Sequence, residues 1–377
     1  NIVGEQSIVK PESGKNLKLS LDIEAQKFLQ DTLSAGIEES KATGAAALIS
    51  KIDNGEIIAA VSLPSYDNNL FVGGISYDEY NRLSSDESKP LLNRFVSAAQ
   101  PPGSTFKTIT ASAGLDSGYI NRSTIFNSTG VFYLGNYPFQ EFRRKAYGPL
   151  NVVQAISKSS NIFFYETVLR MGIDSLVDYS ARYGLSQKTG IDIPGEVSGN
   201  YSSPEYKALL TDEIWYPGDS LNASIGQGYH RVTPVQMLRW VSAIGNNGTL
   251  VVPHFLKEYQ GENGQWVEAE YGSSVLEVKP EILEIIRTGM RESVETGVVY
   301  TLRNSLVSVA AKTGTAEFGV KDEKGNYTKT HAWVMGFFPY ENPQYAFVFF
   351  QEAGGLGSDS GRVANEFINW FVSNGYL

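Results

Sequence analysis

The chain has 377 residues, of which 42% are hydrophobic and 19% are charged, and its formal net charge at pH 7 is −10. This length and composition predict one large or two smaller globular domains and exclude extensive disorder. The negative charge argues against non-specific binding to nucleic acid, which requires a cationic surface. The absence of cysteine excludes disulfide bonds, thiolate nucleophiles and zinc sites with cysteine ligands.

The first 17 residues are polar and include Pro11, Gly14 and Lys15. They predict a linker or the remnant of an N-terminal non-catalytic domain, with residues 18–377 forming the main domain. No run of about 18 apolar residues occurs, so the sequence predicts no membrane-spanning segment. Because the chain starts at Asn1 without a signal-like segment, we expect a leader or membrane anchor to be absent from it.

The front of the chain predicts a helix followed by a hairpin. Asp22 can cap a helix whose apolar positions continue to Ile37. Two apolar runs, 45–51 and 56–63, flank Asn54-Gly55, which is a strong signal for a β-hairpin. Pro64 ends the second predicted strand.

The middle of the chain predicts mainly helices and surface segments. Residues 65–100 are rich in Asp, Asn and Ser and predict a long surface excursion. The turn Pro101-Pro102-Gly103 then precedes a predicted helix over 104–114. Residues 116–150 are rich in turn formers, the spacing of apolar residues predicts one helix over 152–171, and a further helix over 235–244 follows Pro234.

The last third predicts a second hairpin over 259–268, a helix from Pro280 to about Gly297, strands over 306–311, 332–338 and 345–351, and a final helix over 362–372. Strands at both ends around a helical middle predict an α+β fold. We expect a central antiparallel sheet that combines strands from both ends of the chain, flanked by helices, with an all-helical subregion.

Three short motifs carry candidate chemistry, and the first is Ser104-Thr105-Phe106-Lys107. At the start of a helix, residues three apart lie on one face, so the Ser104 hydroxyl and the Lys107 amine can meet. Burial lowers the pKa of a lysine and can make it a neutral base, which activates a serine without histidine. Taken alone, the motif is weak, because Ser-x-x-Lys also arises by chance on exposed helices.

The second motif is Ser159-Ser160-Asn161. A hydroxyl and an amide two residues apart can face one site if they lie in a loop or in a turn between helices. Taken alone, a plain polar turn or a helix N-cap is the better interpretation.

The third motif, Lys312-Thr313-Gly314-Thr315, follows an apolar run. In a strand, Lys312 and Gly314 would face one way while Thr313 and Thr315 face the other. Gly314 would let a substrate backbone approach closely. In isolation, a strand that ends in a polar turn is the better interpretation of this motif.

The order of the motifs turns three weak signals into a strong one. Ser-x-x-Lys, a Ser-x-Asn element and Lys-Thr-Gly follow one another, with 55 residues from Ser104 to Ser159 and 153 from Ser159 to Lys312. The same order marks penicillin-binding proteins and class A β-lactamases.

The chain resembles the class B penicillin-binding proteins over nearly all of residues 18–377. The segment Ser224-Ile225-Gly226-Gln227-Gly228 with the following Thr233-Pro234 is specific to that family, and the run from Trp215 to Asp219 is similar to its elongation-type branch. The resemblance implies the transpeptidase fold shared with serine β-lactamases. It also implies a peptidoglycan D,D-transpeptidase that cross-links stem peptides during wall elongation.

The resemblance implies a role for each motif residue. Ser104 would attack the D-Ala-D-Ala amide of one stem peptide and release D-Ala, and Lys107 would take its proton. Ser159 would relay protons to the leaving amine and from the incoming amine. Asn161 would bind the donor amide, and Lys312 would supply positive potential near Ser159.

The strand motif would bind the donor. Thr313, Gly314 and Thr315 would line the substrate site, with Thr315 favoured over Thr313 as the partner of the terminal carboxylate or its β-lactam equivalent. The backbone N–H groups of Ser104 and Thr315 would form the oxyanion hole, where each donor is typically worth about 10²–10³ in rate.

The resemblance also implies partners and a location. The expected partners are the donor and acceptor stem peptides, β-lactam antibiotics, a membrane glycan polymerase and proteins of the elongation complex. The domain would work on the extracytoplasmic face of the bacterial membrane. Some elongation-type relatives carry structural zinc, but the corresponding region, about 124–150, has Asn127, Glu141 and Tyr147 and neither Cys nor His. We therefore expect no metal and no cofactor.

Three other functions remain open from the sequence. Ser-Thr-Phe-Lys also resembles class D β-lactamases and the related β-lactam sensors, although these carry Ser-x-Val and Tyr-Gly-Asn where this chain has Ser159-Ser160-Asn161 and no Tyr-Gly-Asn. A D,D-carboxypeptidase differs only in using water as the acceptor. A non-catalytic scaffold of the wall-building complex would need neither Ser104 nor Lys107.

Overall fold

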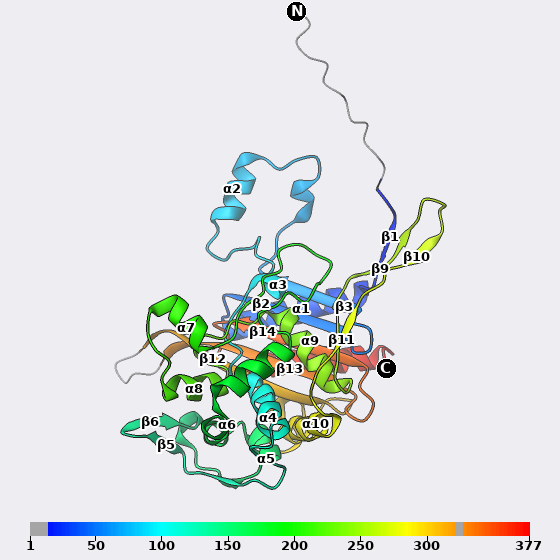
Figure 1. The fold of residues 1–377 in the computed structure, drawn as a ribbon. Helices are drawn as coiled ribbons and strands as arrows, with labels where there is room; N and C mark the ends of the chain where they lie inside the picture. Colours follow the sequence, from blue (N-terminus) through cyan, green and yellow to red (C-terminus); the bar gives the residue numbers. More distant parts are fainter. Residues whose placement is uncertain (1–13, 322–326) are drawn as a thin grey trace, which may run out of the picture.

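A five-stranded antiparallel sheet forms the centre of the computed structural model, which describes residues 14–321 and 327–377 (Figure 1). The strand order is β12-β13-β14-β2-β3. The strands are β2 (Gly44–Lys51), β3 (Ile57–Leu63), β12 (Ala310–Lys321), β13 (Tyr327–Phe338) and β14 (Tyr345–Glu352). The sheet therefore joins strands from both ends of the chain, and the predicted α+β arrangement is confirmed.

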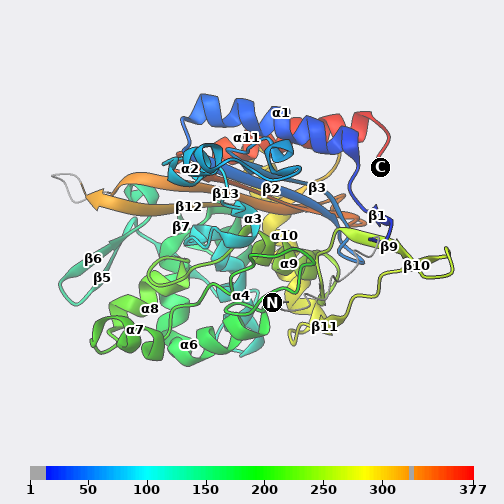
Figure 2. The same ribbon diagram turned by 90° about the horizontal axis from the view of Figure 1, so that it is seen from above.

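Two helices from opposite ends of the chain cover one face of this sheet (Figure 2). They are α1 (Ile23–Ser40) and α11 (Gly357–Ser373). Asp22 caps α1, as predicted, by accepting hydrogen bonds from the N–H groups of Glu24 and Ala25. On β2, Ala45 and Ala47 pack in the core on this face, whereas Ala46 packs in the core on the opposite face, as strand alternation requires.

The other face of the sheet carries the all-helical subregion (Figure 2). Its elements are α4 (Lys107–Asp116), α5 (Val152–Lys158), α6 (Asn161–Arg182), α7 (Pro204–Thr211), α8 (Pro217–Ser224), α9 (Pro234–Gly245) and α10 (Pro280–Glu295). Helix α9 begins with the predicted proline and is fixed by a capping box between Thr233 and Gln236. It packs on β13, β14 and β2, so the helical subregion is anchored to the sheet.

Short strands form small sheets around this core. They are β1 (Leu17–Leu19), β4 (Phe126–Ser128), β5 (Val131–Leu134), β6 (Tyr137–Gln140), β7 (Gly148–Leu150), β8 (Thr249–Val251), β9 (Leu256–Gln260), β10 (Trp266–Glu268) and β11 (Ser273–Val275). The β9–β10 hairpin was predicted, but the strands between residues 126 and 150 were not. The turn-rich composition of that segment hides pairs of strands of only three or four residues each.

Segment 65–100 is only partly the predicted surface excursion. Its first part, with η1 (Asn68–Phe71) and α2 (Tyr77–Ser85), projects from the body (Figure 1). The last part, α3 (Arg94–Ser97), is buried, and the Arg94 guanidinium donates to the Glu352 carboxylate at 2.8 Å. The prediction is wrong for α3 because burial of a paired arginine cannot be read from a polar composition.

Two predicted elements are wrong in their boundaries. The single helix predicted over 152–171 is two helices, α5 and α6, because Ser159 has a left-handed backbone with φ of 57° and ends α5. The strand predicted over 306–311 begins only at Ala310, where its pairing with Phe337 of β13 begins. Leu306, which contributed to the apolar run, is 63% exposed.

The predicted division at residues 17 and 18 falls inside β1, and most of the predicted linker lies outside the described residues. The division into a linker and one domain therefore remains a prediction. Among the residues that the structure describes, no helix has the length and apolar character needed to cross a membrane.

Candidate active site

Ser104 lies on a single 3-10 turn, η2 (Gly103–Phe106), immediately before α4. The α-helix was predicted to start at Ser104 but starts at Lys107. In a 3-10 turn the side chains at i and i+3 are eclipsed, so Ser104 and Lys107 remain on one side of the chain. Ser104 is partly exposed, as a residue that meets a substrate must be, whereas Lys107 is completely buried.

Glycines hold the Ser104 turn against its neighbours. Gly103 has φ of 55°, and its N–H donates to the carbonyl of Gly226 at 3.0 Å. A Cβ on Gly103 would lie 2.7 Å from the Thr315 carbonyl oxygen, and a Cβ on Gly226 would lie 2.1 Å from the Gly103 carbonyl oxygen. Three chain segments thus meet in backbone contact at the predicted nucleophile, which only residues without a side chain allow.

The amine of Lys107 points toward the second motif. Its Nζ donates to the Ser159 carbonyl at 2.7 Å and to the Asn161 side-chain oxygen at 2.6 Å, and it lies 3.3 Å from the Ser159 hydroxyl. Burial lowers the pKa of Lys107 to about 7, against the opposing effect of the Glu141 charge. Among the described residues, the hydrogen bonds of the Lys107 amine go to Ser159 and Asn161, and none joins this amine to the Ser104 hydroxyl.

The second motif is the joint between α5 and α6. Ser159 is the left-handed residue that ends α5, Ser160 caps α6 through the N–H of Phe163, and Asn161 is the first residue of α6. The expected turn between helices is therefore present. The break directs Ser159 and Asn161 toward Lys107, which a continuous helix could not do because its side chains two apart diverge.

Lys312 reaches the same hydroxyl from the sheet. It is completely buried on β12, and its Nζ donates to Ser159 Oγ at 2.9 Å and to its neighbouring carbonyl on Thr313 at 2.9 Å. Burial lowers the pKa of Lys312 well below its ordinary value, and the charge of Lys107 adds to the effect. The Ser159 hydroxyl thus lies between two buried amines.

The remaining residues of the third motif follow strand alternation. A Cβ on Gly314 would lie 2.4 Å from the Pro102 carbonyl oxygen, so this glycine faces the turn that carries Ser104. On the opposite face, Thr315 Oγ1 accepts a 3.1 Å hydrogen bond from the Gly357 N–H, and a Cβ on Gly357 would lie 2.7 Å from the Thr313 Cβ. Both threonines therefore face the start of α11.

Further residues complete the site without having been assigned a role from the sequence. The indole N–H of Trp333 donates to the Pro101 carbonyl at 3.0 Å, and Gln227 Nε2 lies 3.4 Å from the Thr315 carbonyl. Glu141 accepts hydrogen bonds at the start of α6. Gly226 and Gln227 belong to residues 224–228, which supported the family resemblance. That segment was the only feature of the sequence that pointed to these two residues.

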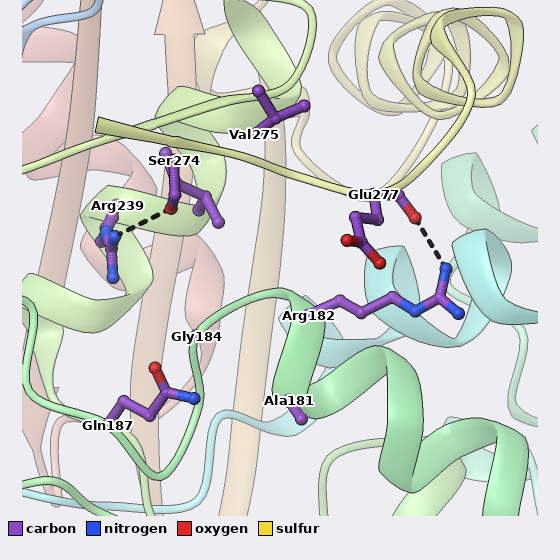
Figure 3. Close-up of a pocket in the computed structure, with 9 residues that line it drawn as sticks. Ala181, Arg182, Gly184, Gln187, Arg239, Ser274, Val275 and Glu277 are labelled. Atoms are coloured by element: carbon purple, nitrogen blue, oxygen red, sulfur yellow. Dashed lines mark hydrogen bonds between the residues drawn. The ribbon is translucent and has the colours of Figure 1, made fainter.

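A pocket of about 270 Å³ lies apart from these residues, between the end of α6, α9 and β11 (Figure 3). In it, Arg182 donates to the Glu277 carbonyl at 2.8 Å and Arg239 lies 3.5 Å from the Ser274 hydroxyl. None of the residues of the three motifs lines it. Because the residues of the three motifs lie elsewhere, we place the candidate active site at Ser104.

No group of three or more His, Asp or Glu side chains within 14–321 and 327–377 is arranged to hold a metal ion. The expectation that the domain works without a metal remains a prediction.

Comparison with known proteins agrees with this arrangement. The family model of the penicillin binding protein transpeptidase domain matches residues 45–372. The peptidoglycan D,D-transpeptidase MrdA of Escherichia coli K12 is 32% identical over 383 residues, which cover 98% of this chain and 59% of that protein. This chain thus spans less than two thirds of the length of that relative.

Two solved structures share the fold. PBP2 of Pseudomonas aeruginosa in complex with WCK 5153 has a TM-score of 0.83 at 32% identity, covering 95% of this chain and 79% of that one. The complex between PBP2 and MreC from Helicobacter pylori also gives a TM-score of 0.83 at 32% identity, covering 96% of this chain and 64% of that one. The resemblance and the fold class expected from the sequence are confirmed. The chain belongs to the penicillin-binding protein transpeptidase domain family.

Proposed function

We propose that this chain is a serine-type D,D-transpeptidase that cross-links peptidoglycan stem peptides through an acyl-enzyme during cell-wall elongation. One observation carries the proposal. The Ser104 turn rests in backbone contact with β12, while Lys107 and Lys312 both lie within hydrogen-bonding distance of the Ser159 hydroxyl. A hydroxyl nucleophile, a base with a lowered pKa and a proton relay are the parts that acyl transfer without histidine requires.

In this mechanism Ser104 Oγ attacks the carbonyl carbon of the D-Ala-D-Ala amide while its proton passes to Lys107. The proton reaches the leaving amine through Ser159, whose hydroxyl lies 3.3 Å from Lys107 Nζ. Release of D-Ala leaves the acyl-enzyme. The amine of a second stem peptide then attacks it and returns a proton by the same route. Asn161 binds the donor amide, and Lys312 keeps the potential at Ser159 positive.

The backbone N–H groups of Ser104 and Thr315 form the proposed oxyanion hole. The backbone contact between Gly103 and Thr315 supports this, because it brings the two segments together. Gly314 leaves room for the donor backbone. The Thr315 hydroxyl binds the donor carboxylate, with Thr313 in a lesser role. These donors stabilise the charge that develops on the carbonyl oxygen.

The substrates, partners and location follow from the family. We propose a D-Ala-D-Ala stem peptide as donor and a stem-peptide amine as acceptor. β-Lactams are the proposed acylating inhibitors, because the chain matches the penicillin binding protein transpeptidase domain. The Helicobacter pylori relative solved with MreC supports partners in the elongation complex, and a membrane glycan polymerase is a further proposed partner. Residues 18–377 form the catalytic domain, which works on the extracytoplasmic face of the membrane.

Intact-mass measurement after incubation with benzylpenicillin tests the proposal. We expect one stable adduct that is absent from Ser104→Ala. Ser84→Ala serves as the control, because Ser84 is exposed on α2, which projects from the body (Figure 1). Lys107→Ala should fold but acylate slower by about 10²–10⁴, the usual contribution of a general base. Acylation of Ser104→Ala would disprove the assignment of the nucleophile.

The same experiment separates the alternative functions. Rapid loss of the adduct with release of hydrolysed penicillin would indicate a β-lactamase, and absence of any adduct would indicate a non-catalytic scaffold. With stem-peptide substrates, cross-linked dimer indicates a transpeptidase, whereas free D-Ala without dimer indicates a D,D-carboxypeptidase.

A further inference from the structure

Glu141 is a buried carboxylate at the start of α6, with only 2% of its surface exposed. It follows β6 directly and receives four hydrogen bonds. The Ser128 hydroxyl donates at 2.9 Å, the N–H of Asn161 at 2.6 Å and the N–H of Ile162 at 3.1 Å, and the Ser160 hydroxyl makes a short hydrogen bond to the same carboxylate. Three of these donors belong to residues 160–162, which form the beginning of α6.

These contacts provide hydrogen-bond acceptors for the first N–H groups of α6. The first N–H groups of a helix have no partner within the helix, and burying them without one is costly. The Glu141 carboxylate satisfies those of Asn161 and Ile162, and a negative charge at a helix N-terminus is also favoured by the helix dipole. The carboxylate thus stabilises the break between α5 and α6 at the second motif.

The residue before Glu141, Gln140, binds the side chain of Asn161. The Asn161 side-chain amide donates from Nδ2 to the Gln140 carbonyl at 2.7 Å, while its Oδ1 accepts from Lys107 at 2.6 Å. Because Nδ2 is held, the amide oxygen must point to Lys107. The segment 140–141 therefore fixes Asn161 through both its backbone and its side chain.

We propose that Glu141 is a positioning residue for acylation, whose buried carboxylate holds the turn 159–161. In this turn the Asn161 amide oxygen meets Lys107, and the Ser159 hydroxyl meets both Lys107 and Lys312. This inference rests on the proposed function, and it attributes part of the rate of Ser104 acylation to a residue outside the three motifs. Glu141 acts through Asn161 and Ser160 and is not itself in contact with the substrate.

The charges around the site support this role. Lys107 faces Lys312 from β12 and Glu141 from the end of β6, and the Glu141 charge raises the pKa of Lys107 against the larger effect of burial. Around Glu141, the aromatic hydroxyls of Tyr147 and Tyr165 have a raised pKa through burial and the Glu141 charge, so both stay neutral. Glu141 therefore influences when Lys107 loses its proton.

The rate of acylation by a fluorescent penicillin, measured across pH, tests the proposal. Glu141→Gln keeps the size and removes the charge. We expect a plateau rate about 10- to 100-fold lower, as for displaced reacting groups, and a midpoint at lower pH, because an anion that favours protonated Lys107 is gone. Glu141→Asp keeps the charge on a shorter side chain, so it should lower the plateau and leave the midpoint unchanged.

Glu196→Gln is the matched control. Glu196 is also a buried carboxylate, 8% exposed, and accepts from the N–H groups of Thr189 and Gly190. It lies outside the motifs, so its variant should acylate with the rate and midpoint of the wild type. If Glu141→Gln does not fold, Ser128→Ala, which removes one donor to the carboxylate, should still slow acylation relative to the control.

The outcomes distinguish this inference from the proposed function. Wild-type protein that forms no Ser104 adduct contradicts the proposed function. A normal wild-type adduct, together with wild-type rates and midpoints in Glu141→Gln and Glu141→Asp, overturns only the role of Glu141. A lower plateau in Glu141→Gln with an unchanged midpoint would limit the carboxylate to a structural role and would also overturn it.

Discussion

The Nζ atom of Lys312 donates a 2.9 Å hydrogen bond to the hydroxyl of Ser159, although 153 residues separate the two in the sequence. Ser159 lies between α5 and α6 of the helical subregion, whereas Lys312 lies near the start of β12 in the sheet. Lys312 is completely buried, and burial of an amine is tolerated only where it finds acceptors. This contact therefore depends on the packing of the two regions against each other.

Replacement of Lys312 by Met should slow penicillin acylation by about 10²–10⁴, because the variant keeps the volume but removes the donor to Ser159. Acylation rates with a fluorescent penicillin measure the effect. Lys27→Met serves as the control, since the Lys27 side chain is 75% exposed on α1. Equal rates in both variants would show that Lys312 does not contribute to the reaction.

Acylation should rise with pH and level off above a midpoint near the pKa of Lys107, about 7. Lys107 can accept the proton of Ser104 only when it is neutral, and the neutral fraction grows as pH rises through the pKa. Because Lys107 and Lys312 interact, the midpoint belongs to the pair. Rate constants from about pH 5 to about pH 9 test this limb, and a rate that falls with increasing pH would contradict Lys107 as the base.

Gly226→Ala should greatly reduce acylation, because the new Cβ would lie 2.1 Å from the Gly103 carbonyl oxygen and must displace the turn that carries Ser104. Gly118→Ala is the matched control. Gly118 has φ of 76°, close to the 75° of Gly226, but nothing lies within 4 Å of its Cβ position. Both variants share the backbone strain, typically about 1–2 kcal/mol, so only the clash distinguishes their acylation rates.

Thr315→Val should weaken acylation more than Thr313→Val. The Thr315 oxygen accepts from the Gly357 N–H, which leaves its O–H free to donate to a ligand carboxylate. Thr315 is also the more exposed of the two, since Thr313 is only 8% exposed. Second-order acylation rates of the two variants, compared at one pH, measure the difference, and a larger loss in Thr313→Val would reverse the assignment.

Trp333→Phe should lower the free energy of unfolding by about 1–3 kcal/mol more than Trp240→Phe, the usual cost of leaving a buried acceptor without its donor. Both indoles are fully buried, but the N–H of Trp333 donates to the Pro101 carbonyl, whereas that of Trp240 has no partner among the described residues. Both changes leave a comparable cavity. Urea unfolding measures the difference, and equal losses would show that the Pro101 bond adds no stability.

Local signals in the sequence account for much of the fold. Asp22 capping α1, the Asn54-Gly55 hairpin and Pro234 at the start of α9 all act through neighbouring residues, and the structure has each of them. The predicted start of the strand over 306–311 was wrong, because a β-strand forms only where the chain pairs with a neighbouring strand. Pairing with β13 begins at Ala310, and no periodicity in an apolar run indicates where a distant strand will pair.

Local signals conflicted at the break after α5, because the run Ser159-Ser160-Asn161 favoured a polar turn or a helix N-cap whereas the apolar spacing favoured one helix. The apolar spacing from Val152 onward continues through the motif as in one helix, and nothing nearby in the sequence marks a left-handed residue at Ser159. The break is stabilised by the carboxylate of Glu141 and by two lysines that come from other elements. Tertiary hydrogen bonds therefore outweighed the local tendency of this segment to form one continuous helix.

From the sequence alone come the reactive groups, their order along the chain and the family, because side-chain chemistry and motif spacing are properties of the chain itself. Only the tertiary structure decides that the Ser159 hydroxyl lies between the amines of Lys107 and Lys312, and that Glu141 holds the turn between them. The physical reason is burial. A pKa and a hydrogen-bond partner depend on which groups replace water around a side chain, and those groups are contributed by distant segments.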